Sequence, residues 1–403
     1  MIERPLYIKK IEALIDKPLI KVLTGVRRAG KSTLLKLLKQ RLLNKGIVEN
    51  RIIYINFESM KYDGLRTSEK LYSYINDIIK DDERYYILFD EIQLVYEWER
   101  AVNSFLVDFN SDMYITGSNS NLLSSELATL LTGRYIRINV YPLSYTEMRK
   151  FSSELVKNST SSDLLWRYIR LGGFPAIHTS YYDESTAYMI INDVYDSIVL
   201  RDVVQRYRIR NVDLLNRIMK YIMDNVGNTF SAKNVADYFK SQYRKVDLNT
   251  VYNYIDALES SYIISRVNRY DVMGKEILKT QEKYYLADQG IQHAVFGFRD
   301  RNIPGILENI VYNELKRREY SVYIGKLKDK EIDFVAEKKN DKIYIQVTYR
   351  MDSIDTINRE FGPLLELKDH YPKYVISLDE NFKDNIEGIK HMHLQEFLLN
   401  THI

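Results

Sequence analysis

The chain has 403 residues, of which 45% are hydrophobic and 28% are charged. At roughly 100 to 200 residues per domain, this length predicts two to four domains with cores of their own. Its 58 Lys and Arg residues nearly balance 55 Asp and Glu residues, and it has no cysteine. This composition excludes an overall field that attracts nucleic acid, and it excludes disulfides and thiolate metal sites.

Neither a membrane span nor an export signal is predicted. No apolar run approaches the ~18 residues that cross a bilayer. The N-terminus, Met1 to Pro5, lacks the basic and then apolar layout of a signal peptide. We therefore expect a soluble, cytoplasmic protein that does not bind membranes.

The first motif is a phosphate-binding loop. A predicted strand at 19–24 precedes a loop that fits G-x-x-x-x-G-K-[ST], and helical apolar spacing follows at 34–38. In this pattern backbone N–H groups and the helix N-terminus bind the phosphates of ATP. We expect Lys31 to reach the β and γ phosphates and Ser32 to hold Mg²⁺. The predicted nucleotide-binding residues are Gly25, Val26, Arg27, Arg28, Ala29, Gly30, Lys31, Ser32 and Thr33.

Two further strand ends carry polar side chains. The apolar strand 85–89 ends in Asp90 and Glu91, at the carboxyl edge where open α/β sheets bind ligands. We expect Asp90 to bind Mg²⁺ and Glu91 to polarise the attacking water. After the strand 112–116, Ser118 and Asn119 are candidates to contact the γ phosphate or that water. An ordinary turn-rich loop would have a similar local sequence.

Six segments occur in a characteristic order. They are GVRRAGKST at 25–33, LFDEIQ at 88–93, ITGS at 115–118, LTGR at 131–134, YPLSYTE at 141–147 and LGGFP at 171–175. Together they resemble the AAA-type ATPases of bacteria and archaea whose C-terminal half was long catalogued as a domain of unknown function. The resemblance spans most of the chain. It implies an ATP site completed by an arginine of a neighbouring subunit, for which Arg134 is the candidate; a surface arginine is the alternative.

The middle of the chain is predicted to be helical. Helices at 162–171 and 186–204 flank the turn at Gly172 and Gly173, and the resemblance implies a lid over the nucleotide. Helices at 214–223, 231–239 and 249–258, followed by strands at 263–267 and 283–286, predict a winged helix. The candidate duplex DNA contacts are Lys240, Arg244, Lys245, Asn249, Thr250, Tyr252 and Asn253.

The DNA interpretation has a counter-argument in the same sequence. The third helix, 249–258, carries no lysine or arginine, whereas affinity for the DNA backbone comes from neutralising phosphates. Domain packing or contact with a protein partner is therefore an equal alternative.

The last hundred residues pose a second chemical question. A helix at 306–315 and strands at 321–325, 331–336 and 342–349 resemble the PD-(D/E)XK nuclease fold. The resemblance places Glu308 and Asp333 on metal-binding positions. Gln346 stands where that fold has a glutamate, and Thr348 stands where it has a lysine. We therefore predict a degenerate nuclease-like domain without cleavage activity.

The fold class predicted is α/β: a P-loop parallel-sheet ATPase core (1–143), a helical lid (144–211), a winged helix (212–290) and a nuclease-like α/β domain (291–403). The predicted function is Mg²⁺-dependent ATP binding and hydrolysis that drives a switch, acting on DNA or a protein partner, in a chain that forms a homo-oligomer. One alternative is a nucleotide-gated adaptor that does not hydrolyse ATP. The other is an ATP-gated, metal-dependent nuclease.

Overall fold

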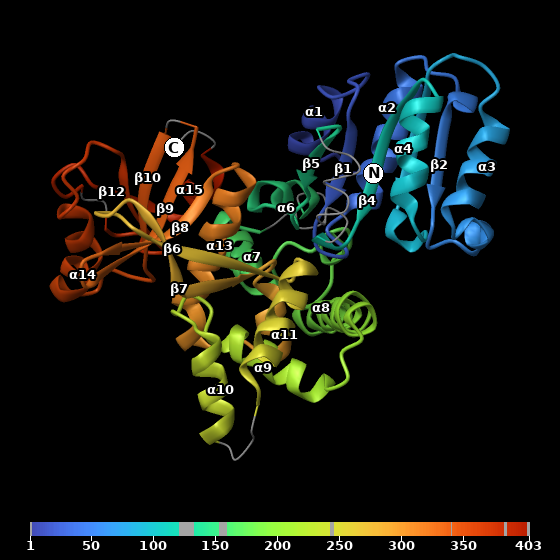
Figure 1. Ribbon diagram of the computed structural model, residues 1–403. Helices are drawn as coiled ribbons and strands as arrows, with labels where there is room; N and C mark the ends of the chain where they lie inside the picture. The colour runs from blue at the N-terminus through green and yellow to red at the C-terminus, as the bar shows by residue number, and fades with distance from the viewer. Residues whose placement is uncertain are drawn as a thin grey trace. The chain divides into compact units, whose positions relative to one another are not determined.

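The computed structural model describes residues 2–120, 133–152, 159–241, 246–339, 341–382 and 385–400 (Figure 1). The chain divides into two compact units. Unit 1 comprises Met1–Val140 with Ser260–Tyr262, and unit 2 comprises Tyr141–Glu259 with Ile263–Ile403. Among the described residues, no helix has both the length and the apolar character needed to cross a membrane.

Unit 1 is built on a sheet of five parallel strands in the order β2-β3-β4-β1-β5. Because all five strands run the same way, their carboxyl ends meet at one edge of the sheet. β1 lies between β4 and β5, so the chain crosses the sheet after β1, and a crevice at the carboxyl ends is the expected ligand site. The strands are β1 (Ile20–Thr24), β2 (Ile52–Asn56), β3 (Tyr85–Asp90), β4 (Ser111–Gly117) and β5 (Tyr135–Asn139).

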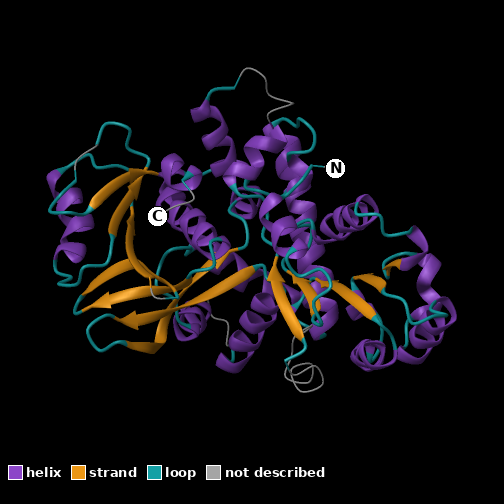
Figure 2. Ribbon diagram, turned by 90° about the horizontal axis from the view of Figure 1, so that it is seen from above, coloured by secondary structure: helices purple, strands orange, loops and turns teal. Residues whose placement is uncertain are grey.

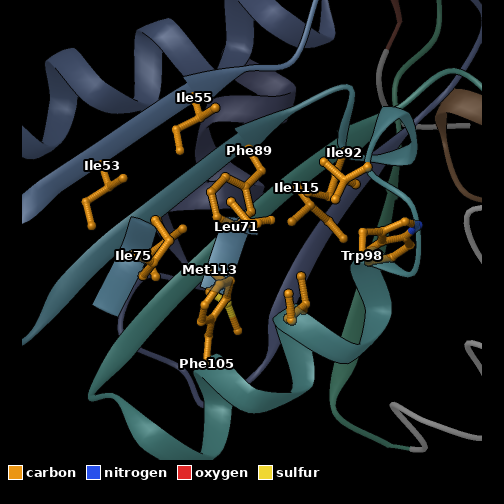
Figure 3. Packing of buried hydrophobic residues seen from close by; sticks show 14 of the residues in the cluster. Ile53, Ile55, Leu71, Ile75, Phe89, Ile92, Trp98, Phe105, Met113 and Ile115 are labelled. Carbon is orange, nitrogen blue, oxygen red and sulfur yellow. The ribbon is translucent and has the colours of Figure 1, made fainter. Parts of the chain in front are cut away.

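Helices pack on this sheet through alternating strand residues. Alternate residues point to one face, where Phe89 and Ile115 meet Leu71 and Ile75 of α3 and Phe105 of α4 (Figure 3). α2 packs on β3 and β4 and contacts α1. The helices of unit 1 are α1 (Pro5–Glu12), α2 (Lys31–Asn44), α3 (Ser68–Ile78) and α4 (Trp98–Asp108).

A buried ion pair joins β1 to β4. The side chains of Lys21 and Asp112 are paired and are both fully buried. Lys21 Nζ also donates to the carbonyl of Lys17 (2.8 Å), and Asp112 accepts bonds from the Asp16 N–H (2.8 Å) and the Tyr114 hydroxyl (3.0 Å). Burial lowers the pKa of Lys21, and Asp112 offsets part of that shift. The two charges therefore depend on each other.

The helices of unit 2 begin close to where the sequence predicts them. The helix predicted at 186–204 changes type, because α-helix ends at Ser197 and the π-helical segment Ile198–Gln205 continues it. The helices that precede the sheet of unit 2 or lie beside its hairpin are α6 (Tyr145–Ser152), α7 (Ser161–Leu171), α8 (Glu184–Ser197), α9 (Val212–Asp224), α10 (Ala232–Ser241), α11 (Leu248–Ser260) and α12 (Gly290–Phe296).

The turn after α7 is fixed by a buried carboxylate. Asp288 accepts hydrogen bonds from the N–H groups of Gly173 (2.6 Å) and Gly290 (2.9 Å). Burial raises the pKa of Asp288 to about 7. Gly172 has φ +71°, and a Cβ there would lie 1.7 Å from the Asp288 carboxylate. Only glycine fits at this position.

A second, mixed sheet of seven strands runs through unit 2 in the order β12-β11-β10-β9-β8-β6-β7. Figure 2 shows the strands in orange. The β6–β7 hairpin joins the C-terminal strands through a parallel pair with β8, at Arg269, Tyr270 and Asp271. The strands are β6 (Ile264–Asp271), β7 (Glu276–Leu286), β8 (Ser321–Leu327), β9 (Lys330–Lys338), β10 (Asp341–Val347), β11 (Lys373–Ser377) and β12 (Lys390–His393).

Three helices accompany these C-terminal strands: α13 (Ile303–Arg317), α14 (Ile354–Leu365) and α15 (Leu394–Leu399). α13 contacts β7 to β10, and α14 contacts β9 to β11. Tyr312 of α13 lies near Phe334, whereas Phe361 and Leu364 of α14 share a core with Val335. Since neighbouring strand residues point to opposite faces, α13 and α14 cover opposite faces of the sheet.

Asp112→Asn is expected to lower the free energy of unfolding by about 3 to 5 kcal/mol, because Lys21 would stay buried without a counter-charge. Urea unfolding followed by circular dichroism measures the change. The matched control is Asp63→Asn, which breaks an exposed pair with Arg66 and is expected to cost less than about 1 kcal/mol. Equal losses in the two variants would contradict the assignment.

Candidate nucleotide-binding site

The predicted phosphate loop connects β1 to α2 and needs glycine at both ends. Gly25 has φ +142°, and a Cβ there would lie 2.1 Å from the carbonyl oxygen of Val140. Gly30 has φ +100°, in the left-handed region, and is the N-cap of α2. Because glycine has no side chain that could accept a hydrogen bond, Gly30 leaves the N–H groups of the first turn of α2 uncapped. This arrangement is suited to binding an anion.

The side chain of Lys31 points back into the phosphate loop. Its side chain is buried, and Nζ donates to the carbonyl oxygens of Gly25 (2.9 Å) and Val26 (3.1 Å). The loop therefore holds the ammonium group where this motif places the phosphates. The two neighbouring arginines behave differently, since Arg27 is paired with Glu58 and Arg28 is exposed.

Ser32 and Asp90, the two predicted Mg²⁺ ligands, are brought together. The Ser32 hydroxyl donates to Asp90 Oδ1 (3.0 Å). Asp90 also accepts from the Thr116 hydroxyl (2.6 Å) and the Tyr54 hydroxyl (3.2 Å). Burial raises the pKa of Asp90, and these hydrogen bonds oppose the rise. A hydroxyl and a carboxylate at this separation fit Mg²⁺, which prefers oxygen ligands and usually takes others from water and phosphate.

Glu91 is held by the neighbouring strand end. Its backbone has φ +56°, and its N–H donates to the Thr116 hydroxyl (3.0 Å). Its carboxylate accepts bonds from Ser118 Oγ (3.3 Å) and from the side-chain amide of Gln93. Ser118 therefore contacts Glu91, and both Ser118 and the next residue, Asn119, are buried.

Three contributors to this site were not predicted: Thr116, Tyr54 and Gln93. Thr116 bonds to both Asp90 and Glu91, and Tyr54 reaches Asp90 from the adjacent strand β2. Thr116 is the last residue before the Gly117-Ser118 turn. Its position at a carboxyl strand end was a signal available in the sequence, whereas the strand order that places it beside Asp90 and Glu91 was not.

Arg134 lies at the amino ends of the strands, opposite the edge that carries the phosphate loop. It is exposed, and its carbonyl oxygen accepts from the N–H of Ile20, the first residue of β1. The phosphate loop follows the last residue of β1, so about five residues at ~3.3 Å each, or about 16 Å, separate the two. The structure does not bring Arg134 to the loop of its own chain.

Arg4 is a further residue that touches the loop. Its guanidinium donates to the carbonyl oxygen of Ala29 (2.8 Å) and lies 4.4 Å from the ring centroid of Tyr7. Arg4 is buried although it precedes α1 by only one residue. The sequence around Pro5 offers no motif from which this contact follows.

In unit 2, the predicted nuclease-like residues also come together. Glu308, Asp333 and Gln346 line a pocket of about 600 Å³ that Thr348 also lines. Gln346 Oε1 accepts from the Asp333 N–H (2.6 Å). Two residues that were not predicted join them, because Lys283 Nζ lies 3.2 Å from Glu308 and 2.7 Å from Glu331.

The predicted DNA contacts are only partly described. Asn249, Tyr252 and Asn253 are exposed on α11, and Thr250 is half-buried. Arg244 and Lys245 lie outside the described residues, as does the side chain of Lys240.

The sheet, the loop and the acidic strand end define an AAA-type P-loop domain. A family model described as an AAA domain matches residues 17–149, and a domain of unknown function (DUF8612) matches residues 162–302. The chain belongs to the family of an uncharacterized protein from Haemophilus influenzae, to which it is 36% identical over 400 residues, 99% of each chain.

Two further comparisons gave matches. An uncharacterized protein from Methanocaldococcus jannaschii is 32% identical over 359 residues, which are 85% of this chain and 78% of that one. The structure of the Aeropyrum pernix Orc1 protein in complex with DNA matches 73% of this chain and 92% of that chain, with 13% identity and a TM-score of 0.32. The family model that matches residues 17–149 confirms the prediction of an AAA-type domain.

Arg4→Ala is expected to weaken ATP binding roughly tenfold, because the loop loses a charged hydrogen bond to the carbonyl of Ala29. Isothermal titration with ATP measures the affinity. Arg66→Ala is the control, since Arg66 pairs with Asp63 on the surface. The affinity of this variant for ATP should match that of the wild type. Unchanged affinity in Arg4→Ala would remove this role.

Proposed function

We propose that this protein binds ATP with Mg²⁺, hydrolyses it and uses the change of bound nucleotide as a switch. The observation that carries the proposal is the meeting of Lys31, Ser32, Asp90 and Glu91 at one carboxyl edge of a parallel sheet. Lys31 supplies a cation that binds the phosphates, Ser32 and Asp90 supply two oxygen ligands for a metal ion, and Glu91 supplies a base for the attacking water.

Each residue has a task in the proposed reaction. Lys31 and the N–H groups of the loop neutralise the phosphate charge that develops as the γ phosphoryl group is transferred. Ser32 and Asp90 hold Mg²⁺, which when bound supplies further charge neutralisation on the phosphate oxygens. Glu91 orients the attacking water and accepts its proton. Ser118 and Gln93 fix the carboxylate of Glu91 for that task.

The second candidate is an adaptor that binds ATP without turning it over. The hydrogen bonds to the Glu91 carboxylate favour the enzyme, because a pure switch has no need of a positioned base. An adaptor would bind ATP tightly and release no phosphate.

We further propose that α9, α10, α11 and the β6–β7 hairpin act as a winged helix that contacts duplex DNA. The exposed polar side chains of Asn249, Tyr252 and Asn253 on α11 support a contact surface. A protein partner is the alternative for the same surface.

For the C-terminal part we propose a nuclease-like domain that has lost its activity. Glu308 on α13, Asp333 on β9 and Gln346 on β10 share one pocket, which is the arrangement that a nuclease site requires. The side chain of Gln346 is an amide and offers no carboxylate at the third position, and its oxygen accepts from the Asp333 N–H.

Glu91→Gln is expected to lower the rate of ATP hydrolysis by about 10² to 10⁴, because the water loses its base, while ATP binding is kept. Phosphate release measures the rate, with and without duplex DNA. Glu97→Gln is the matched control, since Glu97 is a nearby acid paired with the exposed Arg100. Tight ATP binding by a wild type with no turnover would favour the adaptor, and stimulation by DNA would identify the partner class.

We also propose that Arg134 acts on the site of a neighbouring subunit in a homo-oligomer. Arg134→Ala and Lys31→Ala should each be inactive alone. Mixed in equal amounts, they should recover roughly a quarter of wild-type activity per subunit, because randomly assembled neighbours restore some complete sites. Hydrolysis per subunit should also rise with protein concentration. A mixture that shows only the sum of its parts would remove the idea.

A further inference from the structure

One lysine lies at the centre of the carboxylates in the nuclease-like pocket. Lys283 comes from β7, and its Nζ lies 3.2 Å from Glu308 Oε2, 2.7 Å from Glu331 Oε1 and 3.7 Å from Asp333 Oδ1. Glu308 belongs to α13, and the other two acids belong to β9. Carboxylate oxygens from two elements therefore converge on a single nitrogen.

Lys283 and two of its three acids are largely buried. The side chain of Lys283 is 2% exposed, and those of Glu308 and Asp333 are 12% and 13% exposed. Burial alone would lower the pKa of Lys283, but the three carboxylates outweigh burial and hold that pKa above its ordinary value. Burial raises the pKa of Glu308 to about 8, against the opposing effect of Lys283.

Two of these carboxylates also accept hydrogen bonds from groups other than Lys283. Asp333 Oδ2 accepts from the Val347 N–H (2.8 Å), and Glu308 Oε2 accepts from the Tyr285 hydroxyl (2.9 Å). Glu360, another acid that lines the pocket, is paired with Arg359 (2.7 Å). Among the described residues, no group of three or more acidic, histidine or cysteine side chains is arranged to hold a metal ion.

A divalent cation and an ammonium group compete for the same place here. Mg²⁺ needs oxygen ligands at about 2.0 to 2.1 Å in octahedral geometry, and it keeps several waters. An ammonium group has three N–H donors. That of Lys283 lies within hydrogen-bonding distance of Glu308 and Glu331, and Asp333, at 3.7 Å, is a charge partner. The residues present therefore fit the lysine and do not fit the metal that a nuclease of this fold would use.

We propose that the ammonium group of Lys283 takes the place of the divalent cation in this pocket. The pocket is then a lysine–carboxylate cluster that needs no metal, and its acids bind a divalent ion only when the lysine is removed. The proposal rests on the nuclease-like interpretation of the domain and is independent of the ATP site. Removal of the lysine leaves the acids without their cation. A divalent ion that enters would then restore the charge balance.

The experiment compares Mn²⁺ binding by nucleotide-free wild type, Asp333→Asn, Lys283→Met and the double variant Lys283→Met/Asp333→Asn. Electron paramagnetic resonance counts bound Mn²⁺, and the Tm is recorded with and without about 1 mM Mn²⁺, because a ligand of the folded state raises Tm. Any Mn²⁺ at the ATP site is a background common to all four proteins. ATP turnover, assayed on the same samples, reports separately on the proposed ATPase.

The wild type and Asp333→Asn should bind the same number of ions. Lys283→Met should gain one site, with an affinity at least tenfold above any in the wild-type pocket, and its Tm should rise with Mn²⁺. The double variant should lose that site. Lys330→Met is the matched control, since Lys330 lines the same pocket but pairs with Glu366, and it should gain no ion.

Two results would overturn the proposal: a wild-type Mn²⁺ site that Asp333→Asn removes, or a folded Lys283→Met that gains none. A Lys283→Met protein that folds only with Mn²⁺ supports it. If that variant folds in neither condition, the comparison of wild type with Asp333→Asn decides alone.

Discussion

The candidate nucleotide site depends on one buried carboxylate, Asp90, which receives hydroxyl hydrogen bonds from three different elements. Ser32 donates from the first turn of α2, Thr116 from the end of β4, and Tyr54 from β2. A buried carboxylate is costly unless such donors satisfy it, so the three elements cannot move independently without loss of stability. Thr116 also accepts a hydrogen bond from the Glu91 N–H. The first turn of α2, the acidic end of β3 and the end of β4 therefore form one hydrogen-bonded unit.

The parts of this site that sequence reasoning found are those whose chemistry is local. The phosphate loop needs fixed spacing between two glycines and a lysine, and the acids follow directly after an apolar run. Thr116 and Tyr54 were missed because their role depends on the strand order β2-β3-β4-β1-β5, which places β2 and β4 on either side of β3. Strand order is a tertiary property that no spacing in the chain records. Arg4 was missed for a similar reason, because its partner Ala29 is a backbone carbonyl and leaves no pattern in the sequence.

In unit 2 the elements were easier to predict than their assembly. The helix predicted at 306–315 lies within α13, and the helix predicted at 249–258 lies within α11, because their apolar spacing follows the helical period. The role of Lys283 could not be predicted. A lysine in a strand usually marks a solvent-facing position, and only the approach of α13 and β9 makes this one a buried partner of three acids. The acids alone suggested a weakened metal site, whereas the structure places a buried ammonium group among three of them.

The single sheet of unit 2 has a consequence for how such proteins can be recombined. The β6–β7 hairpin follows the helices α9 to α11, yet its strand β6 pairs in parallel with β8, from the part predicted as a separate domain. A fragment that ended between α12 and α13 would keep the pairing of β6 with β7 but would lack β8, so the edge of β6 at Arg269–Asp271 would lose its partner strand. Unpaired strand edges promote association with other chains. The helices with their hairpin and the C-terminal strands are therefore exchanged between genes more safely as one segment than as two.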